Sequence, residues 1–211
     1  MHYKNTRFCE NTNFPALKNV GKYDTPILEP YQYQSTDFIG FNYARTAKNK
    51  SEKGIHFFLD DYQFERVWRE PMAYIDLLMQ YQCVMTPDFS LYMDYPKALQ
   101  IYNHWRKYWL GAFWQTFGIN VIPTVAWSDK SSYDWCFDGT PRHSTIAVSS
   151  VGTQNDKQTK AAFLNGWDEC ISRLEPETII FYGKIPDECR GNIVRIRAFQ
   201  EKFREITVEG K

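Results

Sequence analysis

The chain has 211 residues, which is enough for one substantial core and close to the usual size of a single domain. Its 25 acidic residues balance its 25 basic ones, so no overall field favours nucleic acid or an anionic membrane, and any nucleic-acid contact would be local. The N-terminus lacks an apolar leader, and no stretch approaches the roughly twenty apolar residues that span a bilayer. We therefore expect a cytoplasmic protein without membrane contact; its oligomeric state is not indicated.

Cysteine and aromatic usage narrow the class further. The 5 cysteines are far apart, and no pair has the spacing of a zinc site, so we interpret them as reduced thiols. Aromatic residues are frequent, with 7 Trp, 14 Tyr and 15 Phe. A core of this size does not need so many rings, and we expect some of them to line a cleft.

The N-terminal part of the chain is poor in periodic patterns. Residues 1–37 are predicted to form an extended arm, and residues 38–44 a strand followed by a polar loop. No crossover helix fits between that strand and the next, so we expect it to be antiparallel to its neighbour or at the sheet edge. One α/β domain is expected over residues 38–205, with a C-terminal tail at 206–211.

From residue 54 onward, short apolar runs alternate with amphipathic stretches, which is typical of βα units and a mainly parallel sheet. Strands are predicted at residues 55–59, 83–86, 121–126, 145–148 and 178–181. Helices are predicted at residues 62–81, 96–118, 157–174 and 192–204, and Pro71 is expected to restart or kink the first of them. No switch-point glycine motif is present, so we favour a compact or incomplete barrel-like α/β fold over the alternative of an open doubly wound sheet.

Two aspartates stand out where predicted strands end, because ligands bind at the carboxyl ends of parallel strands. Asp60 follows the first of these strands and Asp88 the second. They are candidates for an acid and base pair, or for ligands of Mg²⁺ or Mn²⁺, although two carboxylates alone are a weak metal signal and we assign no metal site. The neighbouring Asp61 is best explained as a helix N-cap.

Later strand ends carry groups suited to an anionic, ring-containing ligand. The small residues Ser149, Ser150, Gly152 and Thr153 precede a helix, which suits a backbone cradle for phosphate, and an ordinary Ser/Gly loop is the alternative. The next strand end adds a lysine as a point charge, and two aromatic side chains at strand ends could stack on a ligand. These are Lys184, Trp127 and Tyr182.

A further polar pair lies on the predicted helix at 96–118. Asn103 and Arg106 are one turn apart on a helix that is apolar nearly all round. A buried guanidinium demands an anionic partner, and we expect Asp60 or Asp88 to supply it. Arg106 is therefore included with the two aspartates among the candidate catalytic residues.

The chain resembles an uncharacterised domain-of-unknown-function family of bacteriophages and mobile elements of Gram-positive bacteria. The resemblance is carried by Ile-Gly-Phe-Asn-Tyr at 39–43, Phe-Leu-Asp-Asp-Tyr-Gln-Phe-Glu at 58–65, Pro-Asp-Phe-Ser-Leu-Tyr at 87–92 and Ile-Pro-Thr-Val at 122–125. It covers roughly residues 37–185 and departs at Thr86, where a serine is expected. It implies a phage, plasmid or prophage context and no particular activity.

The function we favour is an enzyme acting on a phosphate-bearing small molecule or nucleotide at the strand ends. The alternative is a non-catalytic binding protein that sequesters a nucleotide or blocks a host protein. Signatures of the common nucleotide triphosphatases, dehydrogenases, α/β-hydrolases and zincins are absent from the sequence.

Overall fold

The computed structural model describes residues 17–154, 156–198 and 201. Its strands are β1 (Asn19–Val20), β2 (Thr25–Pro26), β3 (Asp37–Gly40), β4 (Lys53–His56), β5 (Cys83–Met85), β6 (Val121–Ile122), β7 (Thr145–Ser149), β8 (Thr178–Tyr182) and β9 (Ile193–Ile196). Its α-helices are α1 (Glu65–Arg69), α2 (Ile75–Leu78), α3 (Lys97–Gln115) and α4 (Lys157–Leu174).

The strands from β3 to β9 are parallel and lie side by side in the order of the sequence. β3 to β6 form one sheet and β7 to β9 another. An isolated parallel bridge between Thr124 and Ala147 joins the two sheets, with the Val125 amide donating to the Ala147 carbonyl at 2.8 Å. Within the described residues no ladder pairs β9 with β3. The protein therefore has an α/β fold of the incomplete, open barrel type.

One face of these strands forms a shared interior. Side chains from every strand between β3 and β9, or from the residues directly after them, pack into one apolar cluster. Its members include Phe38, Phe58, Cys83, Met85, Ile122, Ala147, Ile180, Tyr182, Val194 and Ile196. Tyr182 of β8 lies 5.0 Å from the ring of His56 in β4 and 4.8 Å from the ring of Phe58, although three strands separate β4 from β8, so the sheet curves toward closure as a barrel does.

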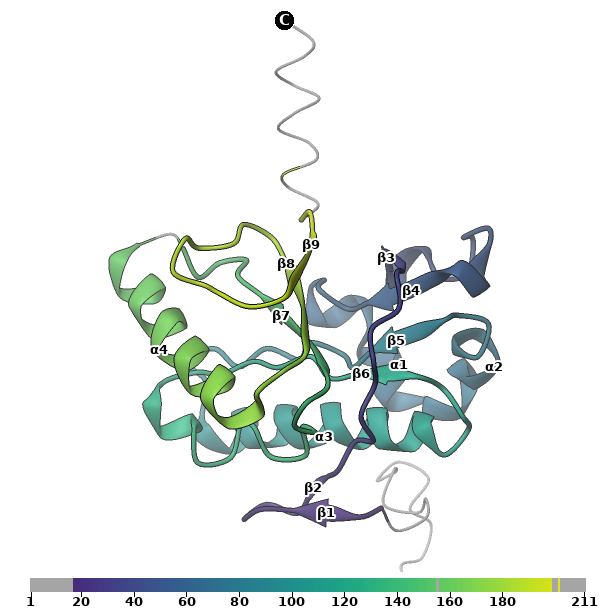
Figure 1. Cartoon of the computed structure of the whole chain (residues 1–211). Helices are drawn as coiled ribbons and strands as arrows, with labels where there is room; N and C mark the ends of the chain where they lie inside the picture. Colours follow the sequence, from purple (N-terminus) through teal and green to yellow (C-terminus); the bar gives the residue numbers. More distant parts are fainter. Residues whose placement is uncertain (1–16, 155, 199–200, 202–211) are drawn as a thin grey trace, which may run out of the picture.

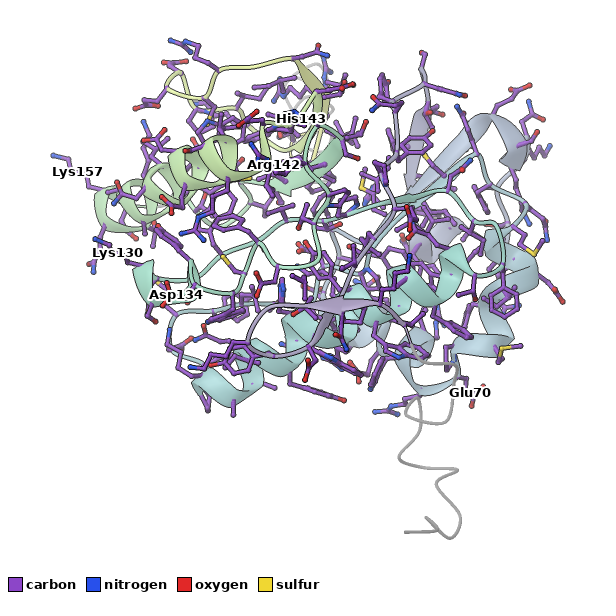
Figure 2. All side chains as sticks on the ribbon, turned by 60° about the horizontal axis from the view of Figure 1, so that its bottom comes forward. Glu70, Lys130, Asp134, Arg142, His143 and Lys157 are labelled. Carbon is purple, nitrogen blue, oxygen red and sulfur yellow. The ribbon has the colours of Figure 1, made fainter. Side chains whose placement is uncertain are left out.

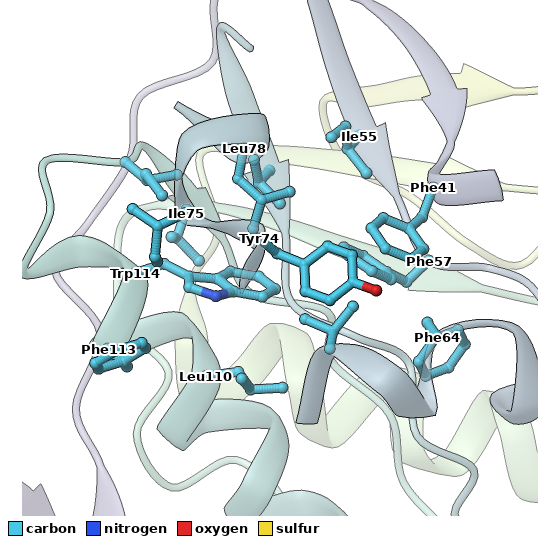
Figure 3. Packing of buried hydrophobic residues seen from close by; sticks show 14 of the residues in the cluster. Phe41, Ile55, Phe57, Phe64, Tyr74, Ile75, Leu78, Leu110, Phe113 and Trp114 are labelled. Atoms are coloured by element: carbon cyan, nitrogen blue, oxygen red, sulfur yellow. The ribbon is translucent and has the colours of Figure 1, made fainter. Parts of the chain in front are cut away.

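Helices cover the outer face. In Figure 1, α3 runs beneath the strands and α4 lies outside β7 and β8. The core beneath β3 to β6 is rich in rings, with Phe41 stacked on Phe57 at 4.8 Å between ring centroids and Phe57 on Trp114 at 5.9 Å (Figure 3). Under α4, Trp167 packs against Phe181 at 5.7 Å. The surplus of aromatic residues is thus used largely for these two outer cores.

The long central helix α3 was correctly predicted from the proline before it and the glycine after it. Pro96 occupies the N-cap position of α3, and Gly118 ends the segment in the left-handed region with φ of 78°. The Gly118 amide donates to the Gln115 carbonyl at 3.0 Å, which satisfies one of the last carbonyls of the helix.

Two predicted helices differ from the structure: the first is interrupted at Pro71, as its expected restart or kink required, but is more broken than predicted, and the last is wrong. The one at 62–81 is broken into α1, a 3₁₀ turn at Pro71–Tyr74 and α2, because Pro71 has no amide hydrogen and holds Glu70 away from helical angles. The one at 192–204 begins instead as strand β9, which pairs with β8. The rest of that predicted helix lies largely outside the described residues.

The N-terminal strand of the domain lies at the sheet edge, as one of the two predicted alternatives required, but it is parallel to β4 and not antiparallel. The chain crosses between β3 and β4 through short 3₁₀ turns at Phe41–Tyr43 and Lys50–Glu52 in place of a helix.

The described part of the predicted arm is held against the domain. β1 and β2 form a small antiparallel pair on the side of α3 away from the strands (Figure 1). The following segment is anchored at Tyr31, whose amide donates to Ser144 Oγ at 2.9 Å and whose carbonyl accepts from the Thr145 amide at 2.8 Å. Residues 1–16 and 206–211 lie outside the described residues. None of the described helices is long and apolar enough to cross a bilayer.

Candidate functional site

A cleft with two compartments lies at the carboxyl ends of the strands. The apolar compartment has a volume of about 280 Å³, and its apolar lining consists of Leu91, Met93, Val125, Ala126, Trp127, Val148, Ala162 and Phe163. The polar compartment has a volume of about 500 Å³ and is lined by polar side chains that include Asn42, His56, Asp60, Gln63 and Arg197. Both compartments share Asp88, Ser90, Tyr92, Ser149 and Val151 as lining residues.

The structure brings most of the sequence-predicted residues to this cleft. Those that line it are Asp60, Asp88, Trp127, Ser149, Gly152, Thr153 and Tyr182. Four others do not line either compartment: Asn103, Arg106, Ser150 and Lys184. The rule that functional side chains follow the ends of parallel strands therefore located the cleft without any recognised motif.

Asp88 is the acidic residue among the five that line both compartments. It follows β5 between Pro87 and Phe89, in a partly buried position. Burial raises the pKa of its carboxyl group to about 6, Lys107 opposes this rise, and the Asp61 carboxylate adds to it. Asp88 therefore changes charge close to neutral pH, which is the property a general acid or base needs.

Lys107, on α3, was missed by the sequence analysis. Its side chain is 0% exposed, and its Nζ has no hydrogen-bond partner among the described residues. Burial lowers the pKa of the amine, and the largest opposing influence is Asp88. The helical spacing of Gln100, His104, Lys107 and Trp114, all buried, was the available signal that this lysine faces inward.

The predicted partner of Arg106 is wrong. Arg106 is buried as expected, at 7% exposed, but its Nη1 donates to both carboxylate oxygens of Glu65, at 2.8 and 3.0 Å. Its guanidinium lies over the Phe89 ring, 3.6 Å from the centroid. Because Glu65 on α1 satisfies the charge, neither Asp60 nor Asp88 has to do so.

Asn103 and Arg106 support the loop after β5 from below. Arg106 Nε donates to Asn103 Oδ1 at 3.1 Å, and Asn103 Nδ2 donates to the Ser90 carbonyl at 2.8 Å. Ser90 in turn donates to Asp61, through its amide at 3.1 Å and its hydroxyl at 2.9 Å. Asn103 and Arg106 thus hold the Asp88 loop through Ser90 without lining the cleft themselves.

The N-cap position falls on Asp60 and not on Asp61. Asp61 was predicted to be a helix N-cap, but Asp60 occupies the N-cap position of the 3₁₀ turn Asp61–Gln63, without a side-chain capping bond. Asp61 instead ties the loop after β4 to Ser90 in the loop after β5. Asp60 is exposed, lines the polar compartment and accepts a long hydrogen bond from Gln63 Nε2 at 3.4 Å.

Several backbone groups of the turn after β7 already form hydrogen bonds within the protein. The Ser150 amide donates to the Tyr182 carbonyl at 3.1 Å, the Val151 amide to Ser149 Oγ at 3.2 Å, and the Thr153 amide to the Ser150 carbonyl at 3.1 Å. Ser150 Oγ donates to the carbonyl of Lys184, whose side chain is exposed. These bonds leave fewer amides for an anion than the sequence suggested, and phosphate binding at this turn stays a prediction.

The first turn of α4 is also satisfied internally. Asp156 caps the helix and accepts hydrogen bonds from the Gln158 and Thr159 amides, both at 2.8 Å. The start of α4 is therefore separated from Gly152 by a self-contained cap.

Two of the predicted rings form walls of the cleft. Tyr182 stacks on Phe58 at 4.8 Å between centroids and lies 5.0 Å from the His56 ring, at the floor of the polar compartment. Trp127 packs 5.3 Å from Phe163 and against Gly166, where a β-carbon would come within 2.1 Å of its indole nitrogen. Gly166 thus allows Trp127 to lie flat along α4.

Two further basic side chains lie away from the cleft, and the potential metal ligands of the described residues do not cluster. His143 and Arg142 lie near the C-terminal end of α4, opposite Lys157 (Figure 2), where His143 Nε2 is 3.6 Å from Glu175 and Arg142 forms an ion pair with the same carboxylate. Across residues 17–154, 156–198 and 201, no three His, Cys, Asp or Glu side chains form a group that could hold a metal ion.

Fold and cleft together define an open parallel α/β barrel with a candidate site at the carboxyl ends of its strands. The chain belongs to the family described as Domain of unknown function (DUF4417), whose profile matches residues 17–200.

Two phage proteins are similar to this chain. The "Gene 1 protein" of Mycobacterium phage L5 is 39% identical over 172 residues, which cover 81% of this chain and 75% of that protein. The "Gene 1 protein" of Mycobacterium phage D29 is 38% identical over 165 residues, covering 77% of this chain and 61% of that protein. The chain thus spans about three quarters of one relative and three fifths of the other. No solved structure matches the chain.

Proposed function

We propose that the protein is a cytoplasmic enzyme, encoded in a phage or mobile-element context, that acts on a phosphate-bearing small molecule or nucleotide. Asp88 is its general acid or base. The observation that carries the proposal is the position of Asp88 in the lining of both compartments, together with a pKa raised to about 6.

The pKa of Asp88 suits proton transfer because a base is most effective when its pKa lies near the working pH. Lys107 is fully buried on α3, and its charge favours the ionised form of Asp88. Asp60 adds a second carboxylate to the polar compartment. Asp60 and Asp88 would also be the ligands if the substrate arrives with Mg²⁺ or Mn²⁺.

A small ligand fits the charge pattern better than a nucleic-acid chain. The balanced net charge gives no overall attraction for a polyanion, so any nucleic-acid contact would be local. Arg197 places one guanidinium group in the polar compartment, where it favours an anionic group such as phosphate. Trp127 and Tyr92 offer rings to a planar ligand in the apolar compartment.

The test begins with binding. Nucleoside mono-, di- and triphosphates and sugar phosphates are titrated into the full chain by calorimetry, with and without Mg²⁺ or Mn²⁺, and each binder is then followed for product formation. Asp88→Asn is expected to keep binding and lose at least about 100-fold in kcat, because general acid or base catalysis contributes that much. Asp94→Asn is the matched control, since Asp94 is exposed and lies outside both linings.

A non-catalytic binding protein that sequesters a nucleotide or blocks a host protein is the second candidate. The exposed side chains of Tyr92 and Met93 at the cleft favour it, because such apolar surface also occurs at binding sites without chemistry. Tight binding by wild type and Asp88→Asn alike, with no product from any ligand, would establish this alternative in place of the enzyme.

A further inference from the structure

The cleft is divided by chemistry as well as by shape. The apolar compartment is bounded by aliphatic side chains and by the Trp127, Phe163 and Tyr92 rings, and it suits a flat group of nucleobase size. The larger polar compartment carries Asn42, Gln63 and Arg197, which offer hydrogen bonds and a positive charge to a hydroxylated, anionic group.

The side chains at the boundary include one carboxylate. Of the residues common to both compartments, Asp88 is the acidic one, and the others are Ser90, Tyr92, Ser149 and Val151. A molecule that occupies both compartments must place the bond between its two parts beside Asp88. Asp60 lies in the polar compartment only, on the side of the hydroxylated group.

Several apolar side chains that line the apolar compartment are exposed to solvent. Tyr92 is 59% exposed, Met93 47% and Val151 46%, although all three are large apolar side chains. Exposed apolar surface of this kind gains free energy when a ligand covers it. A ring inserted against Trp127 would be covered by these side chains on its open side.

Resting on the proposed function, we propose that the substrate is a nucleoside monophosphate and that the bond broken is the N-glycosidic bond. The base occupies the apolar compartment and the sugar phosphate the polar compartment. The position of the bond follows from the covalent structure of nucleotides: the bond from base to sugar is the first one outside the ring, whereas the phosphoester bonds lie several atoms further into the polar compartment.

The chemistry uses water alone as co-reactant. The Asp88 carboxylate takes a proton from a water molecule, the water oxygen bonds to the anomeric carbon, and the carbon–nitrogen bond breaks with its electron pair leaving on the base. The proton is passed to the departing nitrogen, so the products are free base and sugar phosphate. Asp60 stabilises the positive charge that develops on the sugar ring, in the way that paired carboxylates serve glycosidic cleavage.

The experiment incubates the full chain with AMP, GMP, CMP and UMP and with their 2′-deoxy forms, and separates the products by chromatography. Free base and sugar phosphate in equal amounts are expected. Asp88→Asn should lower kcat by at least about 100-fold with little change in KM. Tyr92→Ala should raise KM by about tenfold with little change in kcat, because it removes a stacking surface. Asp94→Asn should match the wild type.

The failure of this inference is distinguishable from failure of the proposed function. Release of inorganic phosphate and intact nucleoside would overturn glycosidic cleavage while leaving an enzyme that acts on a phosphate-bearing molecule. Nucleotide binding without any product would overturn both in favour of a sequestering protein. If Tyr92→Ala changed kcat and left KM unaltered, the placement of the base would be wrong.

Discussion

At the scale of single residues, the buried Lys107 opposes the rise in the pKa of Asp88 that burial causes. A positive charge favours the ionised carboxyl group, so removing it should raise the pKa of Asp88 further above about 6. Lys107→Met keeps the length and apolar stem of the side chain, and is expected to move the titration midpoint of Asp88 to higher pH. The ¹³C chemical shift of the Asp88 carboxyl carbon, followed by NMR, measures this directly.

The control for that change is Lys130→Met, which removes an exposed lysine that is not among the charges acting on Asp88. Its midpoint should equal the wild-type value. If Asp88 is the general base, the acid limb of the pH profile of kcat moves with the midpoint in Lys107→Met, so activity is lost at a higher pH as the solution is acidified. An Asp88 midpoint that stays in place in Lys107→Met contradicts the coupling.

Arg106 is expected to contribute to the stability of the fold and not directly to catalysis. Arg106→Ala should lower the free energy of unfolding by about 3 kcal/mol, because it leaves Glu65 without its partner and removes the contact over Phe89. Urea denaturation monitored by tryptophan fluorescence gives the value. Arg69→Ala, at an exposed arginine on α1, should change it by less than about 0.5 kcal/mol. Equal stability of both variants would show that the Glu65 pair contributes nothing.

The sequence predicted the position of Asp88 in the cleft because a carboxylate after a buried strand falls under a general rule of parallel sheets. It did not identify Lys107, because the apolar stripe of α3 was read from its large hydrophobic side chains. It also did not pair Arg106 with Glu65, since 41 residues separate them and α1 had been merged into one long predicted helix. Such pairings depend on tertiary packing, which local patterns do not contain.

At the scale of elements, the close approach of α3 to β5 depends on Gly111. A β-carbon there would lie 2.7 Å from Thr86 Cγ2 and 2.9 Å from Leu28 Cδ2. Gly111→Val is therefore expected to lower the free energy of unfolding by about 3 kcal/mol, because the helix must move away from the sheet. Ala98→Val, at an exposed position of α3, should cost less than about 1 kcal/mol.

Thermal unfolding followed by circular dichroism compares these two variants with the wild type. Because Thr86 precedes Pro87 and Asp88, displacement of α3 should also weaken ligand binding in Gly111→Val while leaving it unchanged in Ala98→Val. A Gly111→Val protein as stable as wild type would mean that α3 and β5 adjust freely to each other.

Long helices with clear start and stop residues were predicted well, whereas short apolar runs that fit either a helix or a strand were not. α3 and α4 have many turns of consistent amphipathic spacing, and their ends carry proline, aspartate or glycine signals. The run Ile193–Ile196 has apolar residues three apart, which fits one helical turn as well as a strand. Pairing with β8, a contact the sequence pattern does not reveal, decides in favour of the strand.

At the scale of the whole molecule, the order of the parallel strands matches their order in the sequence, and this places all of the loops that follow them at one end. The sequence predicted that arrangement from the alternation of strands and helices. It did not specify where the barrel stays open, because closure depends on whether β9 reaches β3, and both are short strands at the edges of their sheets.

The single bridge between the two sheets has a mechanical consequence. Between Thr124 and Ala147 the wall is held by one pair of residues, whereas β7 and β8 are joined along their full length. The apolar compartment straddles this seam, with Asp88 contributed from one half and Val148 from the other. Any relative movement of the two halves is therefore expected at this seam, and a ligand bound in the compartment is expected to restrict it.

Hydrogen exchange measured by mass spectrometry is expected to show slower exchange of the Val125 and Ala147 amides when a nucleotide is bound, while the amides inside the β7 and β8 ladder exchange at an unchanged rate. Uniform slowing across both halves would instead indicate that the barrel wall moves as one body.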